Sequence, residues 1–351
     1  MSQSEAPVAD EVQTVRPSPA AIWDVIQGHT RYWTVATAVR LGVFAALAEG
    51  DRTSDDVASS CRADPWRLRF LLDALVGMDL LKRAGDHLTL GPAAAAFLVP
   101  GGDAYMGDLV LHGPGVEENW PLLTATLQRG MPAQPIDEDP VFWRAIARAT
   151  FPVQRGLAVK AAQALELDRA AAPLRLLEIG AGAAPWTIGL LESIPQATAV
   201  VNDLTEVMGE ARTAIERHGL SSRVTYSAGD YRGLELPAHS FDIVVLANVV
   251  RTEGEDGAPV MLSRVFDCVR PGGTILIADY FVDEARSAAL PALLLGVTMV
   301  ANTRHGATFT VSTYREWLDA AGFVDAQLRQ LAPGAEILVA RRPSLPRAGD
   351  D

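Results

Sequence analysis

The stretch Leu176-Leu177-Glu178-Ile179-Gly180-Ala181-Gly182-Ala183-Ala184-Pro185 decides the fold of this chain. Its short apolar run predicts a buried strand, its two glycines predict a tight turn, and Pro185 to Leu191 predicts the start of a helix. Glycine adopts backbone angles closed to other residues and lets a ligand come close to the backbone. We therefore predict a strand, a turn and a helix arranged around a nucleotide-like ligand.

Acidic residues follow the next two predicted strands in the same way. Asp203 lies about twenty residues beyond the turn, where a carboxylate can accept hydrogen bonds from ribose hydroxyls. Gly229-Asp230-Tyr231 places an acid and an aromatic ring near an adenine. Pro185 stands where a dinucleotide fingerprint has its third glycine, and Glu178 would repel a pyrophosphate but suits a cationic amino-acid ligand.

The glycine turn and these acids together resemble the class I S-adenosyl-L-methionine (SAM) dependent methyltransferases. From roughly Trp23 to Arg341 the chain is similar to the small-molecule O-methyltransferases of plant caffeate type and of bacterial natural-product pathways. The resemblance implies a Rossmann-like α/β domain with a doubly wound, mainly parallel sheet. It also implies a preceding, mainly α winged-helix domain that forms a homodimer, SAM as cofactor, and an apolar, aromatic specialised metabolite as substrate.

The resemblance assigns roles around the cofactor. Glu178 is expected to steer the methionine amino end, Asp203 to bind ribose, and Asp230 with Tyr231 to contact the adenine. The full expected set of cofactor-binding residues is Glu178, Gly180, Gly182, Asp203, Leu204, Asp230, Tyr231 and Asn248.

The catalytic motif of the family is altered here. After the fourth strand the family carries Asn-x-x-His-x-Trp-x-Asp, in which histidine is the base, whereas this chain has Asn248-Val249-Val250-Arg251-Thr252. A guanidinium keeps its proton at physiological pH and cannot act as a general base. The family's carboxylate partner maps onto Asp279, so we predict an Arg251–Asp279 ion pair. A second family acid would fall near Ala307-Thr308 and is absent.

Several mechanisms stay open. The first is O-methylation by proximity of a hydroxyl acidic enough to ionise, with Arg251 stabilising the phenolate. The second is C- or N-methylation assisted by His305, His112 or Tyr280, and the third is a SAM-binding enzyme of the same fold that catalyses a non-methylating reaction. A structural ion pair is the plain alternative for Arg251. The candidate catalytic residues are Arg251, Asp279 and His305.

The segment from Tyr105 to Leu167 is predicted to be helical and aromatic. Because it precedes the strands whose carboxyl ends bind ligands, it can cover them as a lid, although aromatic residues at helical spacing also serve as core. Pro132 to Pro140 is predicted to be an exposed loop. The expected substrate-pocket residues are His112, Trp120, Trp143, Phe151, Met299 and Asn302.

Helical patterns cover Pro19 to Glu49 and Trp66 to Met78, and a short helix follows the cap at Thr53-Ser54-Asp55-Asp56. A hairpin of Leu80 to Arg83 and His87 to Leu90 completes a winged-helix layout. Such a layout also occurs in ligand-sensing regulators that bind DNA. The formal charge of −13 disfavours that alternative, because phosphate binding requires a cationic face.

A chain of 351 residues suits two domains. Its two cysteines lack ligand spacing, so we expect no metal, no disulfide and a cytoplasmic protein. No apolar leader or anchor is expected, hence no membrane partner. The predicted division is 1–18, a disordered arm; 19–104, the winged-helix dimerisation domain; 105–172, a helical linker and substrate lid; 173–342, the SAM-binding domain; and 343–351, a tail.

Overall fold

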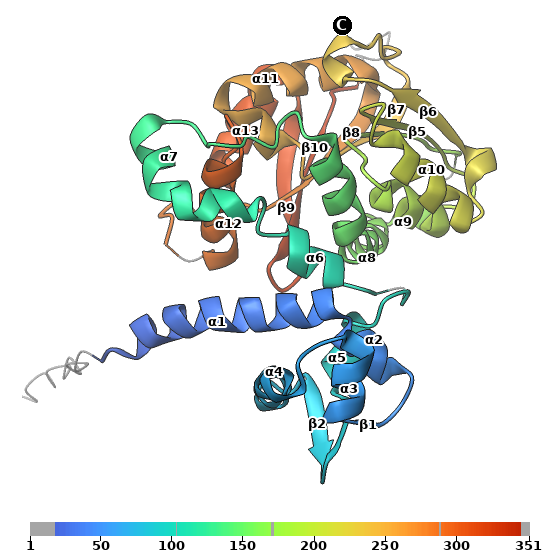
Figure 1. Cartoon of the computed structure of the whole chain (residues 1–351). Helices are drawn as coiled ribbons and strands as arrows, with labels where there is room; N and C mark the ends of the chain where they lie inside the picture. The colour runs from blue at the N-terminus through green and yellow to red at the C-terminus, as the bar shows by residue number, and fades with distance from the viewer. Residues whose placement is uncertain (1–17, 103, 170–171, 288, 345–351) are drawn as a thin grey trace, which may run out of the picture. The chain divides into compact units, whose positions relative to one another are not determined.

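The computed structural model describes residues 18–102, 104–169, 172–287 and 289–344. The predicted arm and tail therefore lie almost entirely outside the described residues. The chain divides into two compact units, Met1–Pro92 and Ala93–Asp351, with the predicted lid in the same unit as the large sheet (Figure 1).

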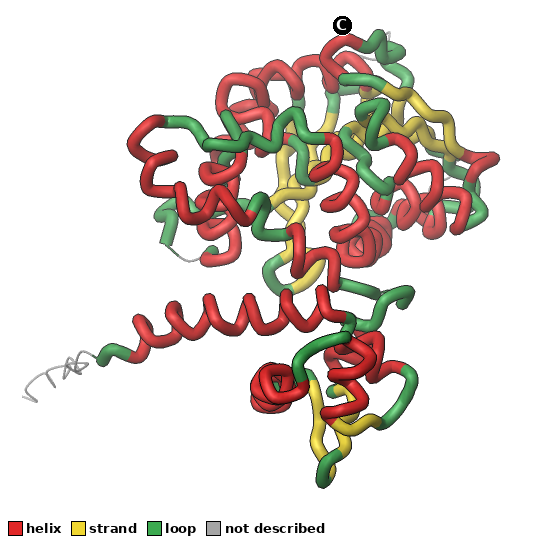
Figure 2. The backbone as a smooth tube through the Cα atoms, in the orientation of Figure 1, coloured by secondary structure: helices red, strands yellow, loops and turns green. Residues whose placement is uncertain are grey.

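The first unit consists of helices and three short strands among its described residues (Figure 2). Its sheet has the order β1-β3-β2 and is antiparallel throughout. The hairpin was predicted from sequence, whereas the two-residue β1 was not. The elements are α1 (Ala20–Leu41), α2 (Val43–Ala48), β1 (Arg52–Thr53), α3 (Ser54–Cys61), α4 (Pro65–Gly77), β2 (Leu81–Ala84) and β3 (His87–Leu90).

Side-chain caps fix the starts of α3 and α4 in this unit. Thr53 accepts a hydrogen bond from the Asp56 backbone N–H, and the Asp56 carboxylate accepts one from the Thr53 N–H, which makes a reciprocal capping box. Asp64 caps α4 in front of Pro65. Each cap satisfies a backbone N–H that has no partner within its helix.

Large apolar side chains of α1 face solvent within the single chain. Ile22, Trp23 and Ile26 are each more than half exposed, and Trp33 is 37% exposed. Exposing such a stripe of apolar side chains to water is unfavourable, and the stripe is typical of a surface that another molecule covers.

The second unit is built on a seven-stranded sheet in the described residues, with the order β6-β5-β4-β7-β8-β10-β9. β10 runs antiparallel to both its neighbours, and the other pairings are parallel, so the predicted mainly parallel, doubly wound sheet with an antiparallel edge is confirmed. The strands are β4 (Arg175–Ile179), β5 (Thr198–Asp203), β6 (Val224–Ala228), β7 (Phe241–Ala247), β8 (Val269–Asp279), β9 (Val324–Ala332) and β10 (Ala335–Arg341).

Helices pack on both faces of this sheet (Figure 1). Side chains alternate along β4, so Leu176 faces α8, α9 and α10 while Leu177 and Ile179 face α11 and α13. The helices are α5 (Pro92–Phe97), α6 (Gly107–His112), α7 (Leu123–Arg129), α8 (Pro140–Ala164), α9 (Pro185–Ser193), α10 (Met208–Arg217), α11 (Val250–Cys268), α12 (Leu290–Asn302) and α13 (Val311–Ala321), with 3-10 turns η1 (Glu117–Leu122), η2 (Leu167–Arg169), η3 (Ser221–Arg223) and η4 (Tyr231–Gly233).

None of the described helices is both long enough and apolar enough to span a membrane.

Candidate active site

A cavity of about 450 Å³ opens where β4, β5, β6 and β7 end. Its lining comes from the glycine turn, from the segments that follow the next three strands, from α8, and from residues 303–305. The parallel strands thus present their carboxyl ends to one hollow, as in other doubly wound sheets.

The glycine turn forms a tight cradle on one wall of the cavity. Gly180 and Gly182 have φ angles of +66° and +59°, in the left-handed region that side chains disfavour. A Cβ at Gly180 would lie 3.0 Å from the Val249 side chain, and one at Gly182 would lie 3.0 Å from the Ala147 Cβ. Both the backbone angle and the space therefore require glycine here.

Glu178 lies beneath this cradle and is 2% exposed. Its Oε2 accepts a hydrogen bond of 2.8 Å from the Thr187 N–H in the first turn of α9. Burial, with a smaller contribution from the Asp203 carboxylate, raises the pKa of Glu178 to about 7, although the hydrogen bonds from Thr187 and Trp186 oppose this shift. A bound cation would favour the ionised carboxylate, because it supplies an opposite charge that none of the described residues places beside Glu178.

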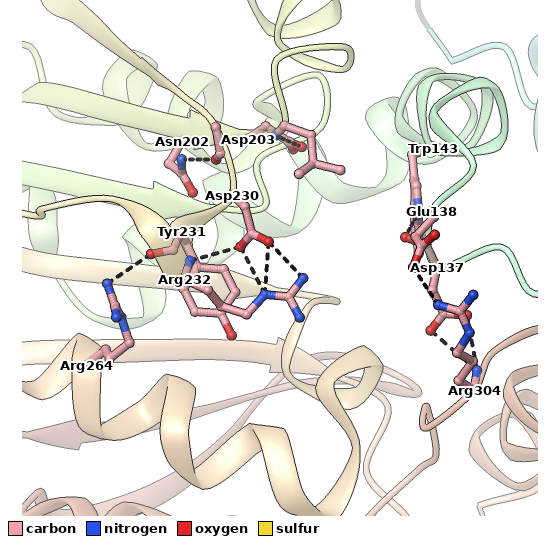
Figure 3. A network of polar contacts seen from close by, with 12 residues as sticks. Asp137, Glu138, Trp143, Asn202, Asp203, Asp230, Tyr231, Arg232, Arg264 and Arg304 are labelled. Carbon is pink, nitrogen blue, oxygen red and sulfur yellow. Dashed lines mark hydrogen bonds and ion pairs between the residues drawn. The ribbon is translucent and has the colours of Figure 1, made fainter.

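Asp203 joins the glycine turn to the end of β5. Its Oδ2 accepts the Gly182 N–H at 2.6 Å, and its Oδ1 accepts the Leu204 N–H at 2.7 Å. Burial raises its pKa. Beside it, the Asn202 amide donates to the carbonyls of Ser227 and Gly229, which holds the ends of β5 and β6 together (Figure 3).

Arg232 forms a two-point ion pair with the carboxylate of Asp230, which follows β6. Nε of Arg232 donates to Oδ1 at 3.0 Å, and its Nη2 lies 2.9 Å from Oδ2 (Figure 3). Tyr231 is 8% exposed, and its carbonyl accepts a hydrogen bond from Arg264. Both predicted adenine-side residues line the cavity.

The predicted Arg251–Asp279 ion pair is confirmed. Nη1 of Arg251 donates to Asp279 Oδ1 and to Asn248 Oδ1, both at 2.7 Å. The hydroxyl of Tyr314, a fully buried residue, donates to Asp279 Oδ2 at 2.9 Å, and the Tyr280 N–H donates to Oδ1. Asp279 is thereby fixed behind Arg251, which itself lines the cavity.

A glycine brings the segment after α12 next to Arg251. Gly254 has a φ of +71° inside α11, and a Cβ there would lie 2.6 Å from the His305 carbonyl oxygen. The Ala307 N–H also donates to the Arg251 carbonyl at 3.1 Å. This approach places His305, which is exposed, in the cavity lining.

A polar cluster closes another part of the wall. Arg304 pairs with Glu138 at 2.7 Å, its backbone N–H donates to the Asp137 carboxylate, and Trp143 Nε1 donates to the Asp137 carbonyl (Figure 3). The Ile136 N–H donates to the Asn302 carbonyl, and Ile136 is 5% exposed. The prediction that residues 132–140 form a simply exposed loop is therefore wrong, because this loop is bound to the end of α12.

Five of the six predicted substrate-pocket residues do not line the cavity; only Trp143 does. Asn302 is 1% exposed, and its Oδ1 accepts from the Val116 N–H and from Asn119 Nδ2. Trp120 Nε1 donates to the Pro114 carbonyl, and Phe151 of α8 packs against the hydrophobic core. The five residues outside the lining are His112, Trp120, Phe151, Met299 and Asn302.

Sequence reasoning missed Tyr314, Asp137, Glu138 and Arg304. In the sequence, Tyr314 belongs to the apolar stripe of α13, so it is expected to be an ordinary core residue; only its hydroxyl gives it a further role. Asp137 and Glu138 stand in a proline-rich loop with the signature of solvent exposure. In the described residues, no group of three or more His, Cys, Asp or Glu side chains is placed to hold a metal ion.

The sheet order defines a Rossmann-like α/β fold, and the cavity lies at the strand ends where such folds bind their ligands. Residues 147–324 match the model of the O-methyltransferase domain, and residues 23–100 match that of the O-methyltransferase dimerisation domain. The chain belongs to this O-methyltransferase family and is a SAM-dependent methyltransferase, as the sequence predicted. The dimerisation domain supports a homodimer, and the exposed side chains of Trp23, Ile26 and Trp33 in α1 lie in that domain.

The chain is similar to curated methyltransferases over nearly its whole length. It is 26% identical over 335 residues to 3-hydroxy-5-methyl-1-naphthoate 3-O-methyltransferase from Streptomyces sahachiroi, covering 92% of this chain and 94% of that protein. It is 27% identical to the N,N-dimethyltransferase OxyT from Streptomyces rimosus, covering 88% and 92%. These relatives are O- and N-methyltransferases of natural-product biosynthesis.

Human N-acetylserotonin methyltransferase, solved in complex with SAM, has the same fold. Its TM-score is 0.83 at 22% identity, with 95% of this chain and 99% of that chain covered. At this identity the likeness concerns the fold.

Proposed function

We propose that this chain O-methylates an ionisable aromatic hydroxyl of a natural-product intermediate without a histidine base. The observation that carries the proposal is the cation of Arg251, held by Asp279 and Asn248 in the wall of the cavity. Two further features support it: the Trp143 ring offers a flat apolar wall, and the relative from Streptomyces sahachiroi is named for a hydroxynaphthoate.

The cavity fits SAM on its own geometry. Gly180 and Gly182 line the cavity with backbone alone, and none of the described residues gives the buried Glu178 a cationic partner. We propose that Glu178 holds the amino end, that Asp203 and Leu204 hold the ribose, and that Asp230, Tyr231 and Asn248 complete the site. When bound, SAM supplies an electrophilic methyl group.

Arg251 has a definite chemical part in this proposal. It cannot accept the proton of the acceptor hydroxyl, because a guanidinium stays charged. A fixed cation beside the hydroxyl lowers the pKa of that hydroxyl and stabilises the oxyanion once the proton has left. Asp279 positions the guanidinium, and we propose the exposed His305 as the group that passes the proton to solvent.

The test is incubation of the protein with SAM and a panel of phenols and arylamines, following S-adenosylhomocysteine and methylated product by mass spectrometry. We expect methyl ethers of acidic phenols and a rate that rises as the phenol pKa falls. Methylated amine or carbon products would replace the proposal with the second mechanism. Consumption of an acceptor without S-adenosylhomocysteine would indicate non-methylating chemistry.

The variant Arg251→His restores the family base and separates the two kinds of O-methylation. We expect it to methylate weakly acidic phenols that the wild type leaves unreacted, because imidazole can accept their proton. For acidic phenols we expect the rate to fall about tenfold, since the permanent cation is lost. If Arg251→His and wild type share one acceptor profile, Arg251 has no electrostatic part in the reaction.

The cytoplasmic location and the absence of nucleic-acid partners stay predictions.

A further inference from the structure

The side-chain amide of Gln154, on α8, is held in one orientation by an indole. Its Oε1 accepts a hydrogen bond of 2.8 Å from Nε1 of Trp186, in the first turn of α9. An indole nitrogen only donates, so the amide atom that faces it must be the oxygen. Trp186 therefore determines that the NH2 group of Gln154 lies on the other side and is available to a ligand.

This NH2 group has no partner, although it belongs to the wall of the cavity. Gln154 is 8% exposed and lines the cavity, and no described residue accepts a hydrogen bond from its Nε2. In the described residues that are not exposed, the unpartnered polar side-chain atoms that protein completely covers are Thr187 Oγ1 and Arg251 Nε. Nε2 of Gln154 is not one of them. It is a donor that the protein neither pairs nor covers, so a ligand in the cavity can supply the acceptor.

Close packing of α8 keeps Gln154 in this position. A Cβ at Gly182 would lie 3.0 Å from the Cβ of Ala147, and one at Gly189 would lie 2.8 Å from the carbonyl oxygen of Arg155. These two contacts lie on either side of Gln154 along α8. The helix thus presses on the glycine turn and on α9, and the amide is a fixed part of the wall.

The first turn of α9 connects this amide with Glu178. The backbone N–H groups of Trp186 and Thr187 both donate to the Glu178 carboxylate, and Pro185 has no N–H. A helix N-terminus often binds an anion, but here Glu178 already takes these donors. Gln154, bonded to the Trp186 side chain, supplies further donors at the same turn.

The described lining of the cavity offers no unpaired arginine or lysine for a ligand carboxylate. It contains no lysine, and each of its arginines pairs with an acid: Arg232 with Asp230, Arg251 with Asp279 and Arg304 with Glu138. An amino acid carries its ammonium and its carboxylate on the same carbon. A site that holds the ammonium at Glu178 therefore needs a donor for the carboxylate close by, and a neutral amide forms a charge-assisted hydrogen bond with it.

We propose that Gln154 binds the α-carboxylate of the methionine part of SAM through its Nε2 N–H groups, and that Trp186 is the residue that positions this amide. The inference rests on the proposed placement of the methionine amino end at Glu178. It is independent of which acceptor atom is methylated. It makes the site selective for nucleoside ligands that carry a carboxylate.

Calorimetric titration tests this inference without turnover. The ligands are S-adenosylhomocysteine, its decarboxylated analogue, which keeps the amino group, and its deaminated analogue, which keeps the carboxylate. We expect the wild type to bind S-adenosylhomocysteine about tenfold or more tightly than the decarboxylated analogue. Equal affinities for these two ligands would overturn the inference.

The variant Gln154→Glu assigns this preference to the NH2 group. It keeps an acceptor for the Trp186 indole and replaces the donors with an oxygen. At pH 8 we expect it to bind the decarboxylated analogue at least as tightly as S-adenosylhomocysteine, because two carboxylates repel each other. Gln163→Glu adds the same charge at an exposed position of α8, and we expect it to keep the preference of the wild type. A wild-type preference in Gln154→Glu would overturn the inference.

A second variant, Gln154→Met, removes the donors without adding a charge. We expect it to bind S-adenosylhomocysteine and the decarboxylated analogue with affinities within about threefold of each other. If Gln154→Met weakens the binding of both ligands by the same factor, Gln154 has only a structural role and the inference fails.

The deaminated analogue separates this inference from the proposed placement of the amino end. We expect Glu178→Gln to lose the preference for S-adenosylhomocysteine over the deaminated analogue and to keep its preference over the decarboxylated one. If only the Gln154 variants show their expected loss, the inference stands and the placement at Glu178 fails. If only Glu178→Gln shows its expected loss, the placement stands and the inference fails.

Discussion

The two ends of the cavity have opposite charge. At the proposed cofactor end, Glu178, Asp203 and Asp230 come from the ends of three adjacent parallel strands. At the proposed acceptor end, Arg251 provides a cation that pairs with Asp279 of β8, and Asp279 in turn accepts a hydrogen bond from Tyr314 of α13. The first end is built by backbone topology, and the second by a chain of side-chain hydrogen bonds.

This difference teaches how one fold can vary its chemistry. The acids follow from a strand order that brings consecutive carboxyl ends to one edge, so they are difficult to alter without changing the sheet. The acceptor end depends on a few side chains on a loop and a helix start, so a single residue such as Arg251 changes what it can do.

We expect the largest effect from a substitution that disrupts the glycine turn at the proposed cofactor end. Gly182→Val introduces a β-branched residue at a φ of +59° and a Cβ 3.0 Å from Ala147, so we expect SAM affinity to fall about 1,000-fold in calorimetric titration. Gly209→Ala is the matched control, because Gly209 lies in α10 with open space around its Cβ position. Unchanged SAM binding by Gly182→Val would place the cofactor outside the glycine cradle.

A second prediction concerns the stability cost of the buried acid. Since burial raises the pKa of Glu178 from 4.5 to about 7, the folded protein retains a proton between these pH values that the unfolded chain has released. Stability without cofactor therefore falls as pH rises through this window and is lowest above it.

Glu178→Gln keeps an acceptor for the Thr187 N–H and removes the charge. We expect it to raise the free energy of unfolding by about 3 kcal/mol at pH 8 and by less than about 1 kcal/mol at pH 5, in urea titrations without cofactor. The exposed Glu235→Gln serves as control at both pH values. A gain of equal size at pH 5 and pH 8 would contradict the raised pKa.

We expect the smallest effect from a substitution that tests the hydrogen bonds behind Arg251 at the proposed acceptor end. Tyr314→Phe removes the hydroxyl that donates to Asp279 at 2.9 Å, so we expect a loss of about 2 kcal/mol in the free energy of unfolding, with SAM affinity changed less than about twofold. Tyr226→Phe is the control, because the Tyr226 hydroxyl makes no hydrogen bond with the described residues, and we expect a change below about 0.5 kcal/mol. A large loss of SAM affinity in Tyr314→Phe would show that the two ends are coupled.

The sequence predicted the sheet and the cofactor end because both depend on local patterns. Alternating strands and helices give a parallel sheet, and a carboxylate that ends a buried strand must lie at the sheet's edge. The prediction of Arg251 against Asp279 came from the family resemblance and from the expected neighbouring strands, and it succeeded because Arg251 follows β7 and Asp279 ends the adjacent β8. The resemblance to a known family added the roles.

The sequence alone determined the doubly wound sheet, the glycine turn and the positions of the acids, because chain periodicity and backbone geometry fix these features locally. Only the tertiary structure decided that Asn302 accepts a hydrogen bond from Asn119 rather than facing the cavity. The same holds for the close approach of the His305 backbone to Gly254, where a side chain would not fit. The tertiary structure also decided that the buried Tyr314 hydroxyl donates to Asp279, the carboxylate that pairs with Arg251. These contacts join residues far apart in the chain, and their geometry follows from the packing of whole elements, which no local pattern encodes.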